Sequence, residues 1–236
     1  MKRIFISLAL TLGLVQTNAQ EISFGIKAEA NMSNFIVPNT SNVAINTLSL
    51  TASRKSNIGF GASLGGFMKY DISRNFAIQP ELLFHLKNSS FEASYKITSP
   101  SSSGAAYYWH YFHYWGAEIP IYALGQWRVG NGRLYAGVGP YVALGFSAVT
   151  DFPINFYEVD ALTEADRPIL HRFDFGFGAM IGYEFRNRIQ VNVGYKIGLF
   201  NVRDYIHHDG NPWHITNHLS DSWRWQTLSL GLGYRF

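Results

Sequence analysis

Residues 172–185 read RFDFGFGAMIGYEF, and this stretch carries the pattern that decides the fold. Its odd positions are all apolar or aromatic, whereas its even positions hold glycine, one methionine and the charged residues Arg172, Asp174 and Glu184. Alternation with a period of two is typical of a β-strand, because successive side chains of a strand point to opposite faces. One face of this strand is therefore apolar, and the other combines charge with the small profile of glycine, which suits a narrow interior.

The same two rows recur in seven further stretches of the chain. These stretches cover residues 22–32, 58–70, 78–87, 118–128, 133–146, 189–199 and 227–236. In all eight, every charged residue falls on the second row, which also holds most of the glycines, and none falls on the apolar row. A lysine or arginine facing lipid at the bilayer midplane costs about 2 to 4 kcal/mol, which accounts for a charge-free outer row. We therefore expect an all-β protein, an eight-stranded antiparallel up-and-down transmembrane β-barrel.

The connections between these stretches alternate between short and long. Residues 71–75, 129–132 and 186–188 are predicted tight turns, whereas 33–57, 88–106, 151–170 and 201–222 are predicted long polar loops. Short turns on one side and long loops on the other are typical of barrels of the bacterial outer membrane. Eight strands bring both termini to the short-turn side, so we expect periplasmic N- and C-termini.

The composition excludes several other classes of protein. The 236 residues are 47% apolar and only 15% charged, which excludes a disordered chain. No cysteine is present, so the chain has no disulfide, no thiolate metal site and no cysteine nucleophile. The formal charge of +3 is scattered and not clustered, and we expect no nucleic-acid partner.

The first residues have the layout of a secretory signal peptide. Lys2 and Arg3 precede an apolar stretch, and small residues follow it before Ala19. We expect a signal peptide at 1–19 and an outer-membrane barrel domain at 20–236. After Val15 no run of 18 uncharged apolar residues occurs, so we expect no transmembrane helix.

The last strand ends on an aromatic residue, with apolar residues at every second position before it. Tyr234 and Phe236 are therefore candidate parts of an assembly signal, which the barrel assembly machinery would read during biogenesis. Outer-membrane lipid is the other expected partner.

Several motifs together resemble the PorT-like outer-membrane β-barrel family of Bacteroidota. They are GIKAEANMSNF at 25–35, QPELLF at 79–84, EIP at 118–120, GPY at 139–141, FDFG at 173–176, YKIGLFN at 195–201 and GLGYRF at 231–236. Glu29 stands where glycine is commoner in that family. The resemblance covers nearly the whole mature chain and implies the barrel fold; through the founding member, it also implies an association with type IX secretion and surface proteins.

The predicted interior row carries thirteen charges of both signs. Eight are positive and five negative: Lys27, Lys69, Lys87, Arg128, Arg133, Arg172, Lys196 and Arg235 against Glu29, Glu81, Glu118, Asp174 and Glu184. The interior of an eight-stranded barrel is just wide enough for side chains to fill. We expect a structural network of paired lumen charges at middle to upper depth, made by Lys27, Glu29, Glu81, Glu118 and Lys196. The alternative is a selectivity ring in a narrow ion or small-solute pore.

An aromatic run precedes the fourth stretch. Alternation places Tyr107, Trp109, Tyr111 and Trp115 on one face, where they are either an interfacial girdle or a surface platform for a glycan, peptide or protein. The loop at 207–218 contains four histidines, a residue type that binds zinc and copper. Nothing in the sequence supplies the second shell that orients metal-bound histidines, so we expect these side chains to be solvated and assign no metal site.

No catalytic residue and no cofactor is predicted. His85, His110 and His113 fall near the rim, but no serine lies in an activating elbow beside them. We therefore expect a structural, surface-interaction or secretion-associated protein, not an enzyme. The remaining alternative to a membrane barrel is a soluble lipocalin-like binding barrel.

Overall fold

The computed structural model describes residues 21–37, 40–45, 48–100, 102–151, 169–204 and 222–236. Within them lie eleven strands: β1 (Glu21–Ile36), β2 (Thr40–Ile45), β3 (Leu48–Asp71), β4 (Phe76–Ser99), β5 (Ser102–Val129), β6 (Gly132–Asp151), β7 (Ile169–Leu170), β8 (Phe173–Glu184), β9 (Ile189–Gly198), β10 (Arg203–Asp204) and β11 (Arg224–Arg235). The predicted signal peptide and the loop at 207–218 lie outside these residues. In the part of the chain that is described, no helix is long and apolar enough to cross a membrane.

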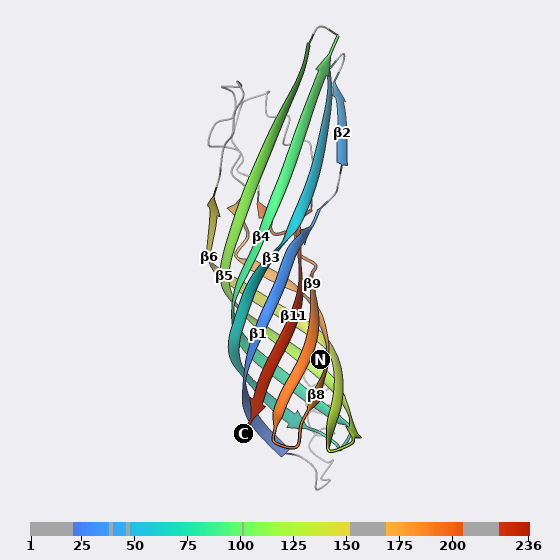
Figure 1. Ribbon diagram of the computed structural model, residues 1–236, viewed down its shortest axis with the longest axis vertical. Helices are drawn as coiled ribbons and strands as arrows, with labels where there is room; N and C mark the ends of the chain where they lie inside the picture. Colours follow the sequence, from blue (N-terminus) through green and yellow to red (C-terminus); the bar gives the residue numbers. More distant parts are fainter. Residues whose placement is uncertain (1–20, 38–39, 46–47, 101, 152–168, 205–221) are drawn as a thin grey trace, which may run out of the picture.

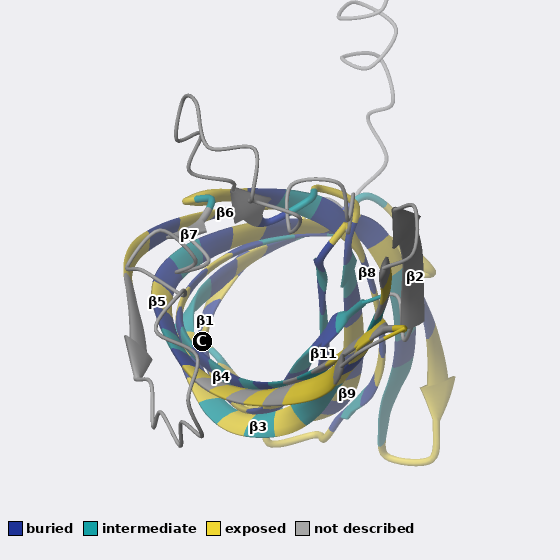
Figure 2. Cartoon of the chain, turned by 90° about the horizontal axis from the view of Figure 1, so that it is seen from above, coloured by how far each residue is buried: buried dark blue, intermediate teal, exposed yellow. Residues whose placement is uncertain are grey.

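Eight of the strands form a closed barrel. Each pairs antiparallel with its neighbours in the order β1, β11, β9, β8, β6, β5, β4, β3, and the pairing of β1 with β3 closes the ring (Figure 2). The order follows the chain, so the predicted up-and-down topology of eight strands is confirmed. β2 is added to the far part of β3, and β7 pairs with β10 in a separate ribbon.

The faces of the wall follow the alternation in the sequence. Residues of the apolar row are exposed on the outside, such as Phe60, Leu64 and Val138, each at least 64% exposed. The opposite row is buried inside, as the strict alternation along β1 and β9 illustrates. An apolar exterior around a polar interior is the arrangement that a lipid environment requires.

Three short turns and both ends of the described chain lie at one end of the barrel. The turns join β3 to β4, β5 to β6 and β8 to β9. Gly130 has a φ of 59° in the two-residue turn between β5 and β6, where a type II′ hairpin needs glycine at its first central position. Glu21 pairs with Asp71 beside the first turn, and the amide of Phe236 donates a 2.8 Å hydrogen bond to the carbonyl of Phe24.

At the other end, β3, β4 and β5 continue far beyond the barrel as a tall sheet (Figure 1). The predicted long loops at 33–57 and 88–106 are therefore wrong. β4 and β5 remain paired up to Ser99 and Ser102, and β2 pairs with β3 over residues 40–53. Beyond the membrane both faces of a sheet can be polar. Backbone hydrogen bonds can therefore keep the strands paired where no lipid-facing apolar row is required.

Two predicted interior charges are exposed instead. Arg128 lies beside the turn between β5 and β6, and Arg172 directly precedes β8. Both stand at a rim, where a long arginine side chain can reach water beyond the wall. The prediction that they are buried in the lumen is wrong.

Candidate functional site

The inward row of β1 shows how the lumen is layered. From the short-turn end it reads Ser23, Gly25, Lys27, Glu29, Asn31, Ser33 and Phe35, and all seven are buried. Small polar groups therefore come first, then a layer of charge, then amide and hydroxyl groups, and finally an aromatic ring.

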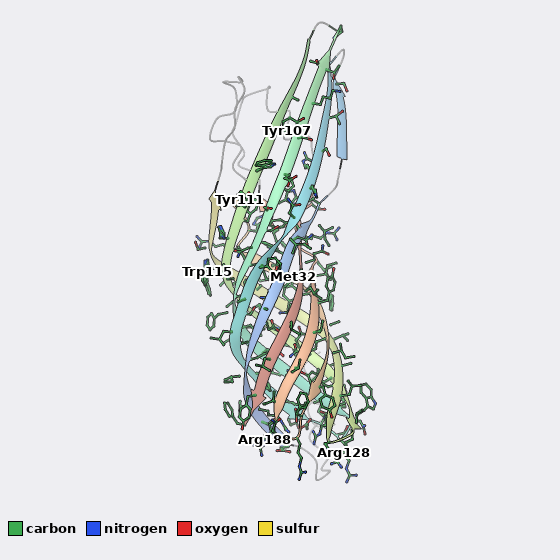
Figure 3. The ribbon with its side chains drawn as sticks, in the orientation of Figure 1. Met32, Tyr107, Tyr111, Trp115, Arg128 and Arg188 are labelled. Atoms are coloured by element: carbon green, nitrogen blue, oxygen red, sulfur yellow. The ribbon has the colours of Figure 1, made fainter. Side chains whose placement is uncertain are left out.

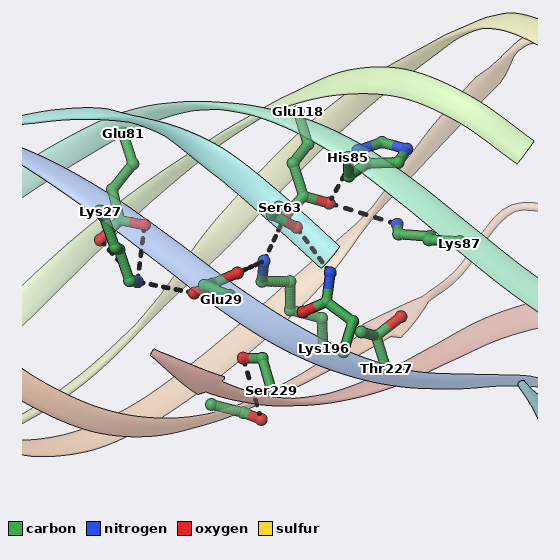
Figure 4. Close-up of polar contacts among 12 residues, drawn as sticks. Lys27, Glu29, Ser63, Glu81, His85, Lys87, Glu118, Lys196, Thr227 and Ser229 are labelled. Atoms are coloured by element: carbon green, nitrogen blue, oxygen red, sulfur yellow. Dashed lines mark hydrogen bonds and ion pairs between the residues drawn. The ribbon is translucent and has the colours of Figure 1, made fainter. Parts of the chain in front are cut away.

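The charged layer is a chain of six side chains with alternating sign (Figure 4). It runs in the order Glu81, Lys27, Glu29, Lys196, Glu118, Lys87. The Nζ of Lys27 lies 3.0 Å from Oε2 of Glu81 and 2.8 Å from Oε1 of Glu29. Lys196 contacts Glu29 at 3.5 Å and also pairs with Glu118. Lys87 completes the chain at 3.2 Å from Glu118.

These six charges are all buried in the lumen, and their formal charges sum to zero. Each side chain in the chain is at most 4% exposed. Charges removed from water in this way are tolerated when each one has partners of opposite sign, and removing one partner leaves an uncompensated charge. All five residues that the sequence singled out lie in this chain, and Lys87 is an additional member.

His85 lies beside this layer. Its Nδ1 lies 3.7 Å from Oε2 of Glu118, and its ring stacks on Tyr114 with the centroids 5.8 Å apart. It faces the lumen and is not at an accessible rim. Asp174 extends the polar surroundings, because it accepts a 2.8 Å hydrogen bond from the hydroxyl of Tyr141.

A second polar network lies nearer the short turns. Glu184 receives hydrogen bonds from Arg235 at 2.7 Å and Gln190 at 2.8 Å, and the Nζ of Lys69 lies 3.6 Å away. Beside it, Gln126 donates a 2.6 Å hydrogen bond to Asp71. Carboxylates thus have partners at this level of the lumen too.

Above the charged layer, the lumen contains an aromatic cluster. We use this name for the buried side chains Phe35, Phe91, Phe112, Tyr114, Val202, Trp223 and Trp225. The ring of Phe35 lies 4.0 Å from that of Trp225 and 5.3 Å from that of Trp223, and the ring of Phe91 lies 4.3 Å from that of Trp223. The cluster joins β1, β4, β5 and the start of β11.

The sequence pattern does not predict this cluster, because the predicted strands end before its residues. Phe35 and Phe91 fall in the predicted loops 33–57 and 88–106, and Trp225 precedes the last predicted stretch at 227–236. The alternation itself continues: 33 and 35 follow the inward row of β1, 89 and 91 that of β4, and 225 that of β11. Each inward row includes these rings when it is extended by two of its alternate positions.

The four predicted platform aromatics all face outward on β5 (Figure 3). Trp115 is near the top of the barrel, whereas Tyr107 and Tyr111 stand on the tall sheet. Trp109 is between them, with half of its surface exposed. None of the four contributes to the aromatic cluster of the lumen.

Tyr234 and Phe236 face outward at the short-turn end. Their rings meet edge to face with centroids 5.7 Å apart, and Phe236 is hydrogen-bonded to β1 through its backbone. Their part in assembly stays a prediction. Among the residues that the structure describes, no three His, Asp or Glu side chains are grouped so as to hold a metal ion.

Comparison with solved structures finds bacterial outer-membrane barrels. OprG from Pseudomonas aeruginosa is 11% identical, with 92% of this chain and 97% of that chain covered and a TM-score of 0.44. Neisserial surface protein A is 13% identical, with 92% and 99% covered and a TM-score of 0.39. Ail of Yersinia pestis is 10% identical, with 93% and 100% covered and a TM-score of 0.31.

No curated protein matches the sequence. A family model does match it, over residues 16–204, which is well over half of the chain. The model describes the outer membrane protein beta-barrel domain, in agreement with the apolar outer wall, the polar lumen and the eight strands described above. The chain belongs to this family of outer-membrane β-barrel proteins.

Proposed function

We propose that this protein is a closed, non-conducting barrel that anchors a β-sheet at the cell surface and acts there as a structural or interaction protein. The observation that carries the proposal is the filling of the lumen by two successive networks. The six-charge chain crosses the middle of the lumen, and the aromatic cluster fills the part above it. An ion following the barrel axis would have to break charge pairs and then displace packed rings.

The cost of separating buried charges favours a closed lumen. Buried lysine and glutamate side chains that satisfy one another hold fixed positions, because separating them exposes each to the full cost of an unpaired buried charge. The aromatic rings add edge-to-face and offset contacts at centroid distances of 4 to 6 Å, which are favourable geometries for aromatic pairs.

The proposed orientation places the short turns and both termini in the periplasm and the tall sheet outside the cell. The support is the asymmetry of the two ends: three short turns at one end, and strands reaching far beyond the barrel at the other. The sheet then stands where partners at the cell surface can reach it.

The motifs that resemble PorT-like proteins extend this proposal. They favour a role in a secretion or surface-protein assembly such as the type IX pathway, with the barrel assembly machinery acting earlier, during biogenesis. Crosslinking in native membranes, followed by copurification through a tag on the barrel, tests this part. Recovery of secretion components supports it, and recovery of the barrel alone speaks against it.

A narrow pore is the second candidate, and one observation favours it. Several buried lumen oxygens lack a hydrogen-bond partner in the protein, among them those of Ser23, Tyr135 and Asn192. Buried water commonly satisfies such groups, and connected water could form a path.

Planar-bilayer recording distinguishes the two candidates. We expect the wild-type protein to give no steady conductance, and the Trp223→Ala/Trp225→Ala double variant to give intermittent openings because the upper layer is thinned. Trp109→Ala, which removes an indole outside the barrel, is the matched control and should stay silent. Steady ion-selective conductance of the wild type, with a selectivity altered by Glu81→Gln, would overturn the closed barrel in favour of the pore.

A further inference from the structure

The outward face of the tall sheet carries a ladder of aromatic rings. Tyr107, Trp109 and Tyr111 occupy alternate positions of β5, and they are 69%, 51% and 46% exposed. Alternate residues of a strand are about 6.8 Å apart, so the rings form a single file about 14 Å long. We call these three residues the aromatic ladder.

The strands beside the ladder present polar side chains at matching heights. On β4, Ser94, Glu92 and Ser90 are the register partners of Tyr107, Trp109 and Tyr111. On β3, Lys55 is in turn the partner of Glu92, and the amide of Asn57 donates a 2.6 Å hydrogen bond to the Glu92 carboxylate. Directly paired residues point to the same face of a sheet, so the face combines a file of rings with hydroxyl, carboxylate, amide and ammonium groups.

The ladder lies above the lipid, so a membrane girdle does not account for it. Trp127 and Trp115, both exposed on β5, are about 40 Å apart along the strand, or about 30 Å in height at the usual tilt of a barrel strand. That height matches the hydrocarbon core, which makes these two tryptophans the interfacial pair. Tyr111 to Tyr107 then stand about 10 to 20 Å higher.

We propose that the aromatic ladder and its polar neighbours form a saccharide-binding face, occupied by the oligosaccharide chains of glycolipids in the surrounding outer leaflet. The apolar C–H face of a pyranose ring carries slight positive charge and stacks on the electron-rich face of an aromatic ring. Its hydroxyl groups, which point sideways from that stack, meet the polar groups of β4 and β3. The inference rests on the proposed cell-surface position of the sheet.

A flat protein partner fits this face less well. Stable protein interfaces have an apolar centre enclosed by a polar rim and bury about 800 Å² on each partner. Among the described residues, the apolar part of this face is one ring wide, and the outward row of the neighbouring strand β4 is polar at Ser90, Glu92 and Ser94. A narrow file of rings beside a polar file suits a thin, extended and amphipathic ligand.

The placement of the face identifies the source of the saccharide. The ladder continues the outward row of β5 that begins in the membrane with Ile121, Ile119 and Trp115. A surface that continues the lipid-facing wall upward looks sideways, in the plane of the membrane (Figure 3). The material beside it at this height is the sugar portion of neighbouring glycolipids, whose lipid portions contact the wall below.

Titration of the full-length folded barrel in detergent tests the proposal. The probe is the lipid-free oligosaccharide that mild acid releases from the lipopolysaccharide of the bacterium in which this protein naturally occurs. The readouts are tryptophan fluorescence and calorimetry. We expect saturable binding that is weakened about tenfold or more by Trp109→Ala and by Tyr107→Ala, because a truncated stacking ring commonly lowers affinity this much. Trp109→Phe, which keeps an aromatic ring, should restore part of the binding, and Trp127→Ala, at the opposite girdle, should bind like the wild type.

Three outcomes overturn the proposal. One is the absence of oligosaccharide binding by the wild type, and another is equal binding by Trp109→Ala and the wild type. The third is loss of a copurifying protein in the ladder variants with oligosaccharide binding intact, which would make the ladder a protein-docking face. Failure of the closed barrel would be seen separately, as conductance in a bilayer without saccharide.

Discussion

The Nζ of Lys27 lies 3.0 Å from Oε2 of Glu81, although the two residues are 54 positions apart in the chain. Lys27 is on β1 and Glu81 on β4, with β3 between them in the wall. Their contact therefore reaches across the inner surface of the barrel and not along one strand pair. It is the first link of the six-charge chain that continues through Glu29 to the far wall.

Breaking this link should destabilise the barrel. We expect Glu81→Ala to lower the free energy of unfolding by about 3 to 5 kcal/mol, because Lys27 would lose one of its two carboxylate partners in a buried site. Urea unfolding of the barrel reconstituted in lipid vesicles measures the change. Glu21→Gln, at an exposed carboxylate, is the control and should change stability little. A small effect of Glu81→Ala would mean that lumen water solvates Lys27.

Thinning the aromatic cluster should also lower stability. Trp225 is 1% exposed and lies between the rings of Phe35 and Tyr114, at 4.0 and 5.8 Å. Replacing it with alanine leaves a cavity, and such truncations cost about 3 to 5 kcal/mol. The same unfolding assay, applied to Trp225→Ala and to the surface variant Trp109→Ala, should show a large loss only for the first. Equal losses would contradict a packed upper layer.

Glycines of the lumen make room for inward tyrosines, and filling that room should be destabilising. Gly182 on β8 is the register partner of Tyr135 on β6, and a Cβ at position 182 would lie 2.5 Å from Cζ of that ring and 2.6 Å from the carbonyl of Val191. Overpacking of this kind costs about 1 to 3 kcal/mol. Gly182→Ala should therefore lower the temperature at which the folded, heat-modifiable form of the barrel is lost on gel electrophoresis. Gly104→Ala is a matched control, because a Cβ there meets nothing within 4 Å. If both variants unfold at the same temperature, the close approach of Tyr135 does not require glycine at position 182.

Removing the last residue should reduce the amount of assembled barrel. Phe236 contributes one backbone hydrogen bond to β1 and an exposed ring, so its deletion should leave the lumen network intact. If the terminal aromatic is an assembly signal, cells should contain less folded, heat-modifiable protein in the outer membrane. Phe185→Ala removes another outward ring at the same end and should not have this effect. Wild-type levels after the deletion would argue against the signal.

The sequence alone determined which segments cross the membrane and which way their side chains face. Lipid on one side and a narrow polar lumen on the other impose opposite requirements on successive residues, so Phe173, Phe175 and Phe177 could be assigned to the outside and Asp174 and Glu184 to the inside without coordinates. The same rule identified the charges at 27, 29, 81, 118 and 196 as neighbours in one lumen. It failed for Arg128 and Arg172, because at a rim a long side chain can leave the lumen for water.

Only the tertiary structure decided which charges pair, what lies above them and how far the strands continue. Pairing across the lumen depends on the register of strands that are distant in sequence, as for Lys27 and Glu81 or Lys196 and Glu118. The aromatic cluster is assembled from the inward rows at the ends of several strands, and which of these rings meet depends on the same register. Beyond the membrane the backbone ladder alone sustains β4 and β5 to Ser99 and Ser102, and hydrogen bonds between backbones leave no period-two signal in the side chains.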